Sequence, residues 1–134
     1  MSLPQISGEF GVVQDPELRF SEAGKAWLKI RGKAVARTKD ANGQWVDGDM
    51  CFIDILVFQK LAENVTESVT KGSTITVTGS LQMREWEDNE GRKQKTYQIQ
   101  ASSVGVTPRF SPVKPAELVA VTPQQAPQSE EAPF

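Results

Sequence analysis

The stretch at residues 26–39, AWLKIRGKAVARTK, separates two classes of side chain by strict alternation. Side chains of an extended strand alternate between its two faces. One face then carries Trp27, Lys29, Arg31, Lys33, Val35, Arg37 and Lys39, and the other carries Ala26, Leu28, Ile30, Gly32, Ala34 and Ala36. A helix would spread the same cations around its whole circumference. The pattern therefore predicts a strand with one packed face and one cationic face.

This predicted strand is longer than the usual five or so residues, so it must bend. Gly32 is the predicted site of a bulge, because a residue without a Cβ adopts such a conformation at least cost. A long, bent strand of this kind suggests the wall of a small barrel whose outer face meets a polyanion. A solvated strand face without a ligand is the alternative.

Composition narrows the classes of function. The chain of 134 residues has one cysteine, Cys51, and no histidine. It therefore has no intramolecular disulfide and no cysteine-rich zinc site, and it lacks the commonest general base and metal ligand. We expect no enzyme, cofactor or metal. No signal peptide and no apolar run of membrane-spanning length is visible, so a soluble, cytoplasmic protein is expected.

The flanking sequence predicts further strands. Residues 6–13 form a short first strand, Asp15-Pro16 favours a turn, and residues 17–20 resume an extended chain. Arg19 is either a phosphate contact or an ion-pair partner of a neighbouring glutamate. Residues 40–43, DANG, predict a tight hairpin turn, and residues 47–49 predict a second bend before a strand at residues 50–59.

The strand at residues 50–59 has a β-branched inner face and a mixed outer face. Its inner side chains are Cys51, Ile53, Ile55 and Val57, and its outer side chains are Phe52, Asp54, Leu56 and Phe58. Near-continuous apolar runs often have both faces buried. The carboxylate of Asp54 between two phenylalanines favours partial exposure of the outer face instead.

The remaining folded part predicts one helix and a hairpin. Residues 61–71 have helical periodicity, with Gly72 placed as a C-terminal cap. In residues 73–86 and 95–106, the expected inner side chains are Ile75, Val77, Leu81, Met83, Tyr97, Ile99 and Ala101, with irregularities at Gly79 and before Val104. The order predicts an all-β OB-fold, a five-stranded Greek-key barrel with one short helix between strands three and four, over residues 1–107.

The chain changes character beyond Thr107. Residues 108–129 are rich in proline and glutamine and show no periodicity, which predicts a disordered linker. The chain closes on EEAPF at residues 130–134, two acids and a terminal aromatic. A tail that ends in phenylalanine by chance is the alternative to a binding tip.

Four segments in order resemble the bacterial single-stranded DNA-binding protein family, which includes phage members. They are QDPELRF, VFQKLAENV, KGSTITVTGSL and REWEDNEGRKQKTYQI, followed by the terminal EEAPF. The resemblance implies an OB-fold homotetramer that wraps single-stranded DNA without sequence preference in the cytoplasm, nucleoid-associated, or in the host cytoplasm if phage-encoded. It also implies that the tip recruits replication, recombination and repair proteins.

The expected interface combines stacking aromatics with phosphate-binding cations. The resemblance assigns stacking to Phe52, Phe58 and Trp86, and Trp45 replaces an aromatic that many members place at the end of the basic strand. The expected phosphate contacts are Arg19, Lys29, Arg31, Lys33, Arg37, Lys39 and Arg84, and the expected protein-binding tip is Glu130, Glu131, Pro133 and Phe134. Asp54 and the two-acid tip depart from the family pattern.

Two other functions fit parts of the sequence. An OB-fold subunit that binds a protein through its exposed aromatics also explains the aromatics and arginines, because protein interfaces are enriched in both. An RNA-binding module of the cold-shock kind lacks its short aromatic motifs here. The concentration of six cations and no acid in residues 23–39 favours nucleic acid.

Overall fold

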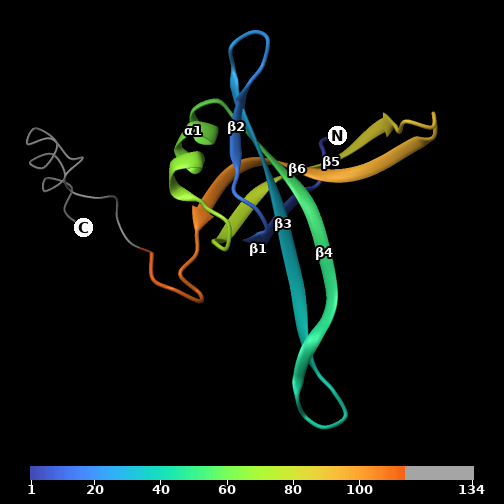
Figure 1. Cartoon of the computed structure of the whole chain (residues 1–134), viewed down its shortest axis with the longest axis vertical. Helices are drawn as coiled ribbons and strands as arrows, with labels where there is room; N and C mark the ends of the chain where they lie inside the picture. The colour runs from blue at the N-terminus through green and yellow to red at the C-terminus, as the bar shows by residue number, and fades with distance from the viewer. Residues whose placement is uncertain (114–134) are drawn as a thin grey trace, which may run out of the picture.

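The computed structural model describes residues 1–113 as six strands and one helix. The elements are β1 (Gln5–Val12), β2 (Glu17–Phe20), β3 (Ala26–Lys39), β4 (Trp45–Phe58), α1 (Gln59–Ser68), β5 (Thr74–Glu87) and β6 (Lys93–Val106) (Figure 1). The strand predicted at residues 26–39 is β3, with the same bounds. The predicted turn at residues 40–43 joins β3 to β4, and Gly43 has a φ of 78° there.

The strands close into a barrel. Their order is β1-β5-β6-β4-β3-β2, and an additional β1–β3 pairing at Gly11 and Val12 joins the two ends. All neighbours are antiparallel except β4 and β6, which are parallel. The short β2 is an addition beside β3, so α1 lies between the third and fourth of the five barrel strands. This is the predicted OB-fold.

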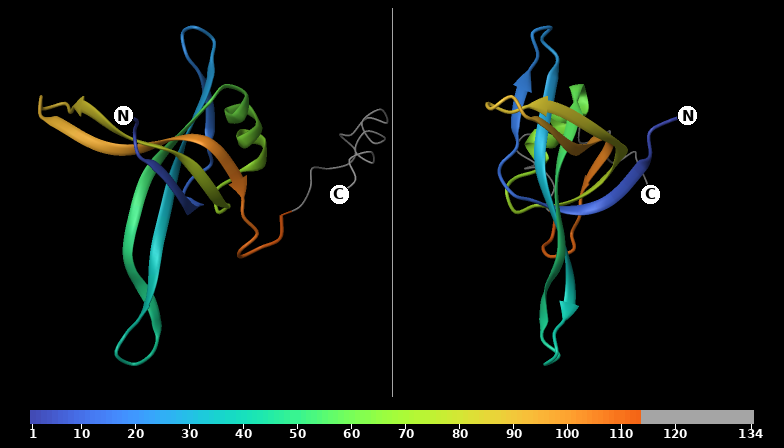
Figure 2. Two further views of the ribbon diagram at one scale, coloured as in Figure 1. Left: turned by 180° about the vertical axis from the view of Figure 1, so that it is seen from behind. Right: turned by 90° about the vertical axis from the view of Figure 1, so that its right-hand side faces the viewer.

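The core is made by the alternating faces that the sequence indicates, except at Cys51, which was predicted to face inward and is exposed. Leu28, Ile30, Ile55, Ile75 and Ile99 are fully buried. The helix α1 adds Ala62 and Val65 to the same cluster, and it covers the side of the barrel away from the β5–β6 hairpin, as Figure 1 and the left view of Figure 2 show. One face of each barrel strand is therefore occupied by packing, which leaves the other face for solvent or a ligand.

Two long hairpins project from the barrel (Figure 2). The outer parts of β3 and β4 form one, and the outer parts of β5 and β6 form the other; we call them the β3–β4 arm and the β5–β6 arm. Met83 and Tyr97 were predicted to point inward, and this is wrong: they are 48% and 60% exposed. They face each other across the β5–β6 arm, where the strands have already left the core.

The irregularity of β3 and β4 lies at a different glycine from the one predicted. Gly32 pairs regularly with Ile53, and the register shifts instead between Val35 and Arg37, whose partners are Met50 and Asp47. Between these two pairs the chain advances by two residues in β3 and by three residues in β4, so β4 carries one extra residue. The predicted bend at residues 47–49 is thus a bulge within one continuous strand.

Three glycines lie where a Cβ atom would approach a neighbouring strand too closely. A Cβ on Gly32 would lie 3.0 Å from Ile55 Cδ1, and one on Gly48 would lie 2.9 Å from Thr38 Cγ2. A Cβ on Gly79 would lie 2.2 Å from the Gln100 carbonyl oxygen, at the predicted irregularity of β5, which is confirmed. The predicted cap at Gly72 is wrong, because α1 ends at Ser68 with Val69 as its C-cap.

Candidate nucleic-acid interface

The cationic face of β3 and the mixed face of β4 form one outer wall of the barrel. Antiparallel pairing sets side chains opposite one another on the same face. The pairs are Trp27 with Phe58, Lys29 with Leu56, Arg31 with Asp54, and Lys33 with Phe52. Cations of β3 and aromatics of both strands therefore share this wall, which we call the outer face.

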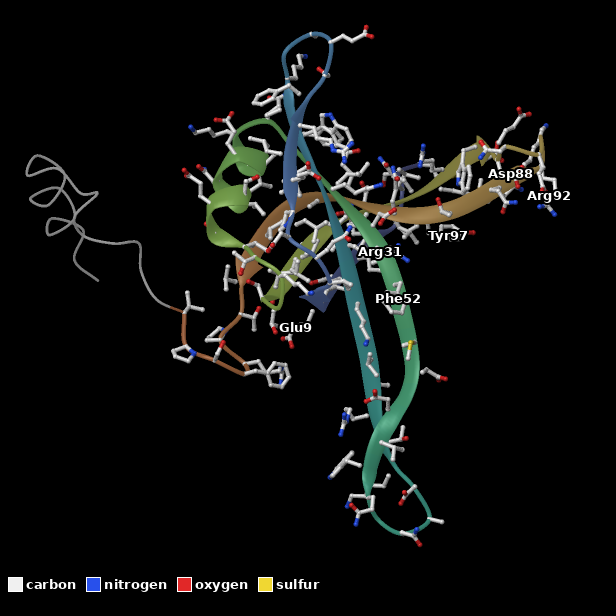
Figure 3. The ribbon with its side chains drawn as sticks, viewed as in Figure 1. Glu9, Arg31, Phe52, Asp88, Arg92 and Tyr97 are labelled. Carbon is white, nitrogen blue, oxygen red and sulfur yellow. The ribbon has the colours of Figure 1, made fainter. Side chains whose placement is uncertain are left out.

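The aromatics of the outer face are open to solvent. Phe52 is 44% exposed and Phe58 is 40% exposed, so the expected partial exposure is confirmed and a fully buried outer face is excluded. The guanidinium carbon of Arg31 lies 5.4 Å from the centroid of the Phe52 ring, and Lys33 Nζ lies 5.7 Å from it (Figure 3). A flat ring flanked by cations offers a base a stacking surface and its phosphate a charge.

Acids compete for some of the predicted phosphate-binding cations. Arg31 Nη1 donates a hydrogen bond to Asp54 Oδ1 at 3.1 Å, and Arg37 Nη1 donates one to Asp47 Oδ1 at 2.8 Å. Arg19 lies 3.8 Å from Glu17 and also 5.8 Å from the Trp27 ring centroid. Within residues 1–113, the predicted cations without an ion pair are Lys29, Lys33, Lys39 and Arg84.

Trp27 is a site residue that the sequence reasoning missed. It lines a hollow of about 250 Å³ on the outer face together with Lys29, Asp54, Leu56, Arg84 and Gln98. Arg84 and Lys29 come from strands on opposite sides of β4 and β6, and the barrel brings them to the same hollow. The sequence did contain a signal for Trp27, because its alternation places Trp27 on the same face of β3 as the cations.

Phe58 stands at a strained junction. The helix α1 begins at Gln59, directly after β4, and Phe58 is an N-cap without a side-chain hydrogen bond. The abrupt turn gives Gln59 a φ of 60°, a conformation that costs a residue with a Cβ about 1 to 2 kcal/mol. Such strain often accompanies functional positions, and here it accompanies an exposed phenylalanine on the outer face.

The β3–β4 arm extends the same arrangement. Trp45 pairs with Lys39 across the arm and is 59% exposed, and Lys39 Nζ lies 5.2 Å from its ring centroid. The extra residue of the bulge inverts the alternation of β4, so that Trp45, at an odd position, shares a face with Lys39 and Arg37. Without the bulge, Trp45 would face the other side.

The β5–β6 arm carries Trp86 and a capped turn. Trp86 is 39% exposed and has the same parity as Arg84. In the turn, Asp88 Oδ1 accepts hydrogen bonds from the backbone N–H groups of Arg92 and Glu90, each at 2.9 Å. The bond from Arg92 is the largest cause that lowers the pKa of the Asp88 carboxyl. A carboxylate thus fixes the tip of the arm (Figure 3).

The chain after β6 contacts the barrel through Arg109. The Arg109 guanidinium forms a two-bonded ion pair with the Glu9 carboxylate, with Nη2 to Oε2 at 3.2 Å, and this pair raises the pKa of Arg109. The predicted tip residues lie outside the described residues; they are Glu130, Glu131, Pro133 and Phe134.

The part of the chain that the structure describes contains neither a metal-binding cluster nor a membrane-spanning helix. Residues 1–113 hold no group of three or more histidine, cysteine, aspartate or glutamate side chains that could bind a metal ion. The helix found there is not long and apolar enough to cross a membrane.

Comparison with known proteins gives one consistent family. The model of the single-strand binding protein family matches residues 8–107. The chain is 38% identical over 104 residues to a protein of Streptomyces coelicolor named single-stranded DNA-binding protein 2, covering 77% of this chain and 52% of that protein. It is also 38% identical over 101 residues to the single-stranded DNA-binding protein of Corynebacterium glutamicum, covering 75% and 45%. The chain thus spans about half the length of these curated relatives.

Solved structures agree on the fold. A small single-stranded DNA-binding protein from Streptomyces coelicolor superposes with a TM-score of 0.69 at 24% identity, over 80% of this chain and 96% of the other. A deletion mutant of the single-stranded DNA binding protein from Thermus aquaticus gives 0.63 at 23% identity, over 79% and 51%.

Proposed function

The chain belongs to the single-strand binding protein family, and on that premise we propose that it binds single-stranded DNA along the outer face, without requiring a particular sequence. The observation that carries the proposal is that β3 and β4 present exposed aromatics and cations on one shared face. A single strand offers base faces and phosphates together, and such a surface contacts both. Stacking contributes about 1 to 3 kcal/mol per base.

The four unpaired cations supply the electrostatic part of the proposed binding. Each phosphate that a cation neutralises on a single strand contributes about −0.7 to the slope of log K against log salt. Arg84 lies on the β5–β6 arm next to Met83, Lys29 and Lys33 lie on the barrel, and Lys39 lies on the β3–β4 arm. The strand is therefore expected to run across the barrel wall and onto the β3–β4 arm.

A fluorescence titration with oligo(dT) at two salt concentrations tests the proposal. We expect quenching of tryptophan fluorescence, because Trp27, Trp45 and Trp86 all lie on the proposed path, and a binding constant that falls with salt. Absence of binding at low salt would leave the alternative, an OB-fold subunit that binds a protein through the same aromatics. The same titration with oligo(U) measures the preference for DNA over RNA.

The proposed assembly is a homotetramer. The exposed pair of Met83 and Tyr97 supports association, because apolar side chains on the side of the β5–β6 arm away from Trp86 offer an area that a second copy can cover. Native mass spectrometry measures the state directly. Replacing Tyr97 by aspartate should lower the oligomeric state, and replacing the equally exposed Phe20 by aspartate is the matched control.

The proposed role in replication, recombination and repair depends on the tip. Glu130, Glu131, Pro133 and Phe134 form an acidic, apolar terminus suited to a partner with a basic rim around an apolar pocket. Deletion of Phe134 should abolish capture of such partners and leave the oligo(dT) affinity unchanged or slightly higher. If the full-length and truncated proteins retain the same partners, the tail has no recruiting role.

A further inference from the structure

A second hollow of about 340 Å³ lies beside the first, at the end of the outer face nearest to α1. Trp27 borders both hollows. We call this one the Trp27–Phe58 pocket; its lining is Ser21, Lys25, Ala26, Trp27, Phe58, Gln59 and Gln100. Its volume is at the small end of the range for ligand pockets, so it suits a single flat ring.

The pocket has aromatic side chains on two neighbouring strands. Trp27 and Phe58 are cross-strand partners, and the buried Ala26 also lines the pocket. The strained backbone at Gln59 follows Phe58 directly. Aromatic walls and a small apolar floor are the surroundings in which an unstacked nucleobase is held.

Two side chains on the polar rim of the pocket, Lys25 and Gln100, present hydrogen-bond donors, whereas Ser21 and Gln59 beside them can donate or accept. Gln98 Nε2 donates to Gln82 Oε1 at 3.1 Å, and Gln82 Nε2 donates to Gln100 Oε1 at 2.6 Å. This chain of amides occupies the oxygen of Gln100 and leaves its NH₂ group available to the pocket. The ammonium of Lys25 is also a donor.

We propose that the Trp27–Phe58 pocket is a base-selective subsite that takes one unpaired guanine in preference to adenine. Guanine presents two adjacent acceptors, N7 and O6, whereas adenine presents the N6 amino donor beside N7. A donor rim satisfies the first edge and opposes the second. The inference rests on the proposed function and adds a local preference to a surface that is otherwise neutral to sequence.

The test compares purines that stack alike and differ at the edge. Fluorescence titrations of the full chain use a dA oligomer and the same oligomer with isolated dG residues at regular intervals. We expect the dG oligomer to bind about two- to tenfold more tightly, the effect of one or two net hydrogen bonds. Hypoxanthine, which keeps O6 and N7, should behave like guanine, and 2-aminopurine, which has neither O6 nor the N6 amino group, should bind less tightly than guanine.

Two variants assign the preference to the pocket. Gln100→Met keeps the length of an exposed side chain and removes its donors, so it should abolish the preference while oligo(dT) still binds. Gln14→Met, at an exposed glutamine outside both hollows, should retain it. Thermal unfolding of both variants shows that they are folded, and the comparison of oligomers needs only the unaltered protein.

The outcomes separate the inference from the proposed function. If the protein binds oligo(dT) but does not distinguish the purines, the inference is wrong and the proposed function stands. A preference that survives Gln100→Met would also overturn the assignment to this pocket. If no oligomer binds at all, both fail together.

Discussion

Replacing Asp54 by asparagine should strengthen the binding of single-stranded DNA. Asp54 is the acid on the outer face between Phe52 and Phe58, and its carboxylate holds Arg31 at 3.1 Å. The amide of asparagine has nearly the same shape but no charge. The change therefore releases the Arg31 guanidinium, beside the Phe52 ring, to a phosphate.

The structure sets the size of this effect. One additional phosphate contact steepens the slope of log K against log salt by about 0.7, which corresponds to about a fivefold gain in affinity near 0.1 M salt. The loss of folding stability should be at most about 1 kcal/mol, because an exposed ion pair contributes little. The two side chains are 41% and 27% exposed, so this ion pair is only partly withdrawn from water.

The assay is a series of oligo(dT) titrations over a range of salt concentrations. Asp49→Asn is the matched control: it removes the same charge from the same strand, at an exposed residue that forms no ion pair within residues 1–113. The difference between the two variants isolates the release of Arg31 from the general change in net charge.

Equal slopes for Asp54→Asn and Asp49→Asn would refute the reasoning. Arg31 would then not reach a phosphate even when it is free, and the ion pair would be a structural feature of the β3–β4 pairing. A weaker affinity for Asp54→Asn alone would show that Asp54 positions Arg31 for DNA rather than competing for it.

Three further perturbations test other parts of the interface. Trp27→Ala should weaken oligo(dT) binding by about 1 to 3 kcal/mol, and an unchanged titration would remove Trp27 from the interface. The pKa of the Asp88 carboxyl is lowered from 3.8 in the folded chain, so Asp88 fully stabilises the β5–β6 turn above pH 3.8, and this stabilisation is lost as the pH falls through the lower pKa of the folded state. Amide exchange of Glu90 and Arg92, measured by NMR, should then accelerate. Constant exchange would contradict this prediction. Gly48→Ala adds a Cβ 2.9 Å from the Thr38 methyl group on the facing strand, so it should shift the bulge and alter the fluorescence of Trp45. An unchanged spectrum and melting temperature would show that the bulge accommodates the added Cβ.

Alternation predicted the faces of the strands but not which faces are covered. In β3, Leu28 and Ile30 were assigned to the core correctly because a barrel lies behind them. Met83 and Tyr97 continue the same alternation, but the β5–β6 arm extends past the barrel and nothing within residues 1–113 covers them. The period of a strand contains no information about where the core ends.

The geometry of the candidate interface could be predicted where it depends on one strand and not where it depends on several. The cations of β3 share a parity that the sequence displays. The ion pair of Arg31 with Asp54 depends on the register between strands, and the hollow at Trp27 depends on the parallel pairing of β4 with β6. A sequence also gives no sign that Gln59 occupies a conformation in which glycine is expected.

The bulge at residues 47–49 imposes a length rule on the β3–β4 arm. Side chains alternate with a period of two, so extending each strand of the arm by a pair of residues, about 6.6 Å, would carry the tip outward and keep Trp45 and Lys39 on the outer face. Extending each strand by a single residue would instead turn Trp45 and Lys39 together to the opposite side, while leaving the composition of the arm almost unchanged. Arms of different length in engineered versions of this barrel can therefore keep one continuous outer face only if each strand grows or shrinks by an even number of residues.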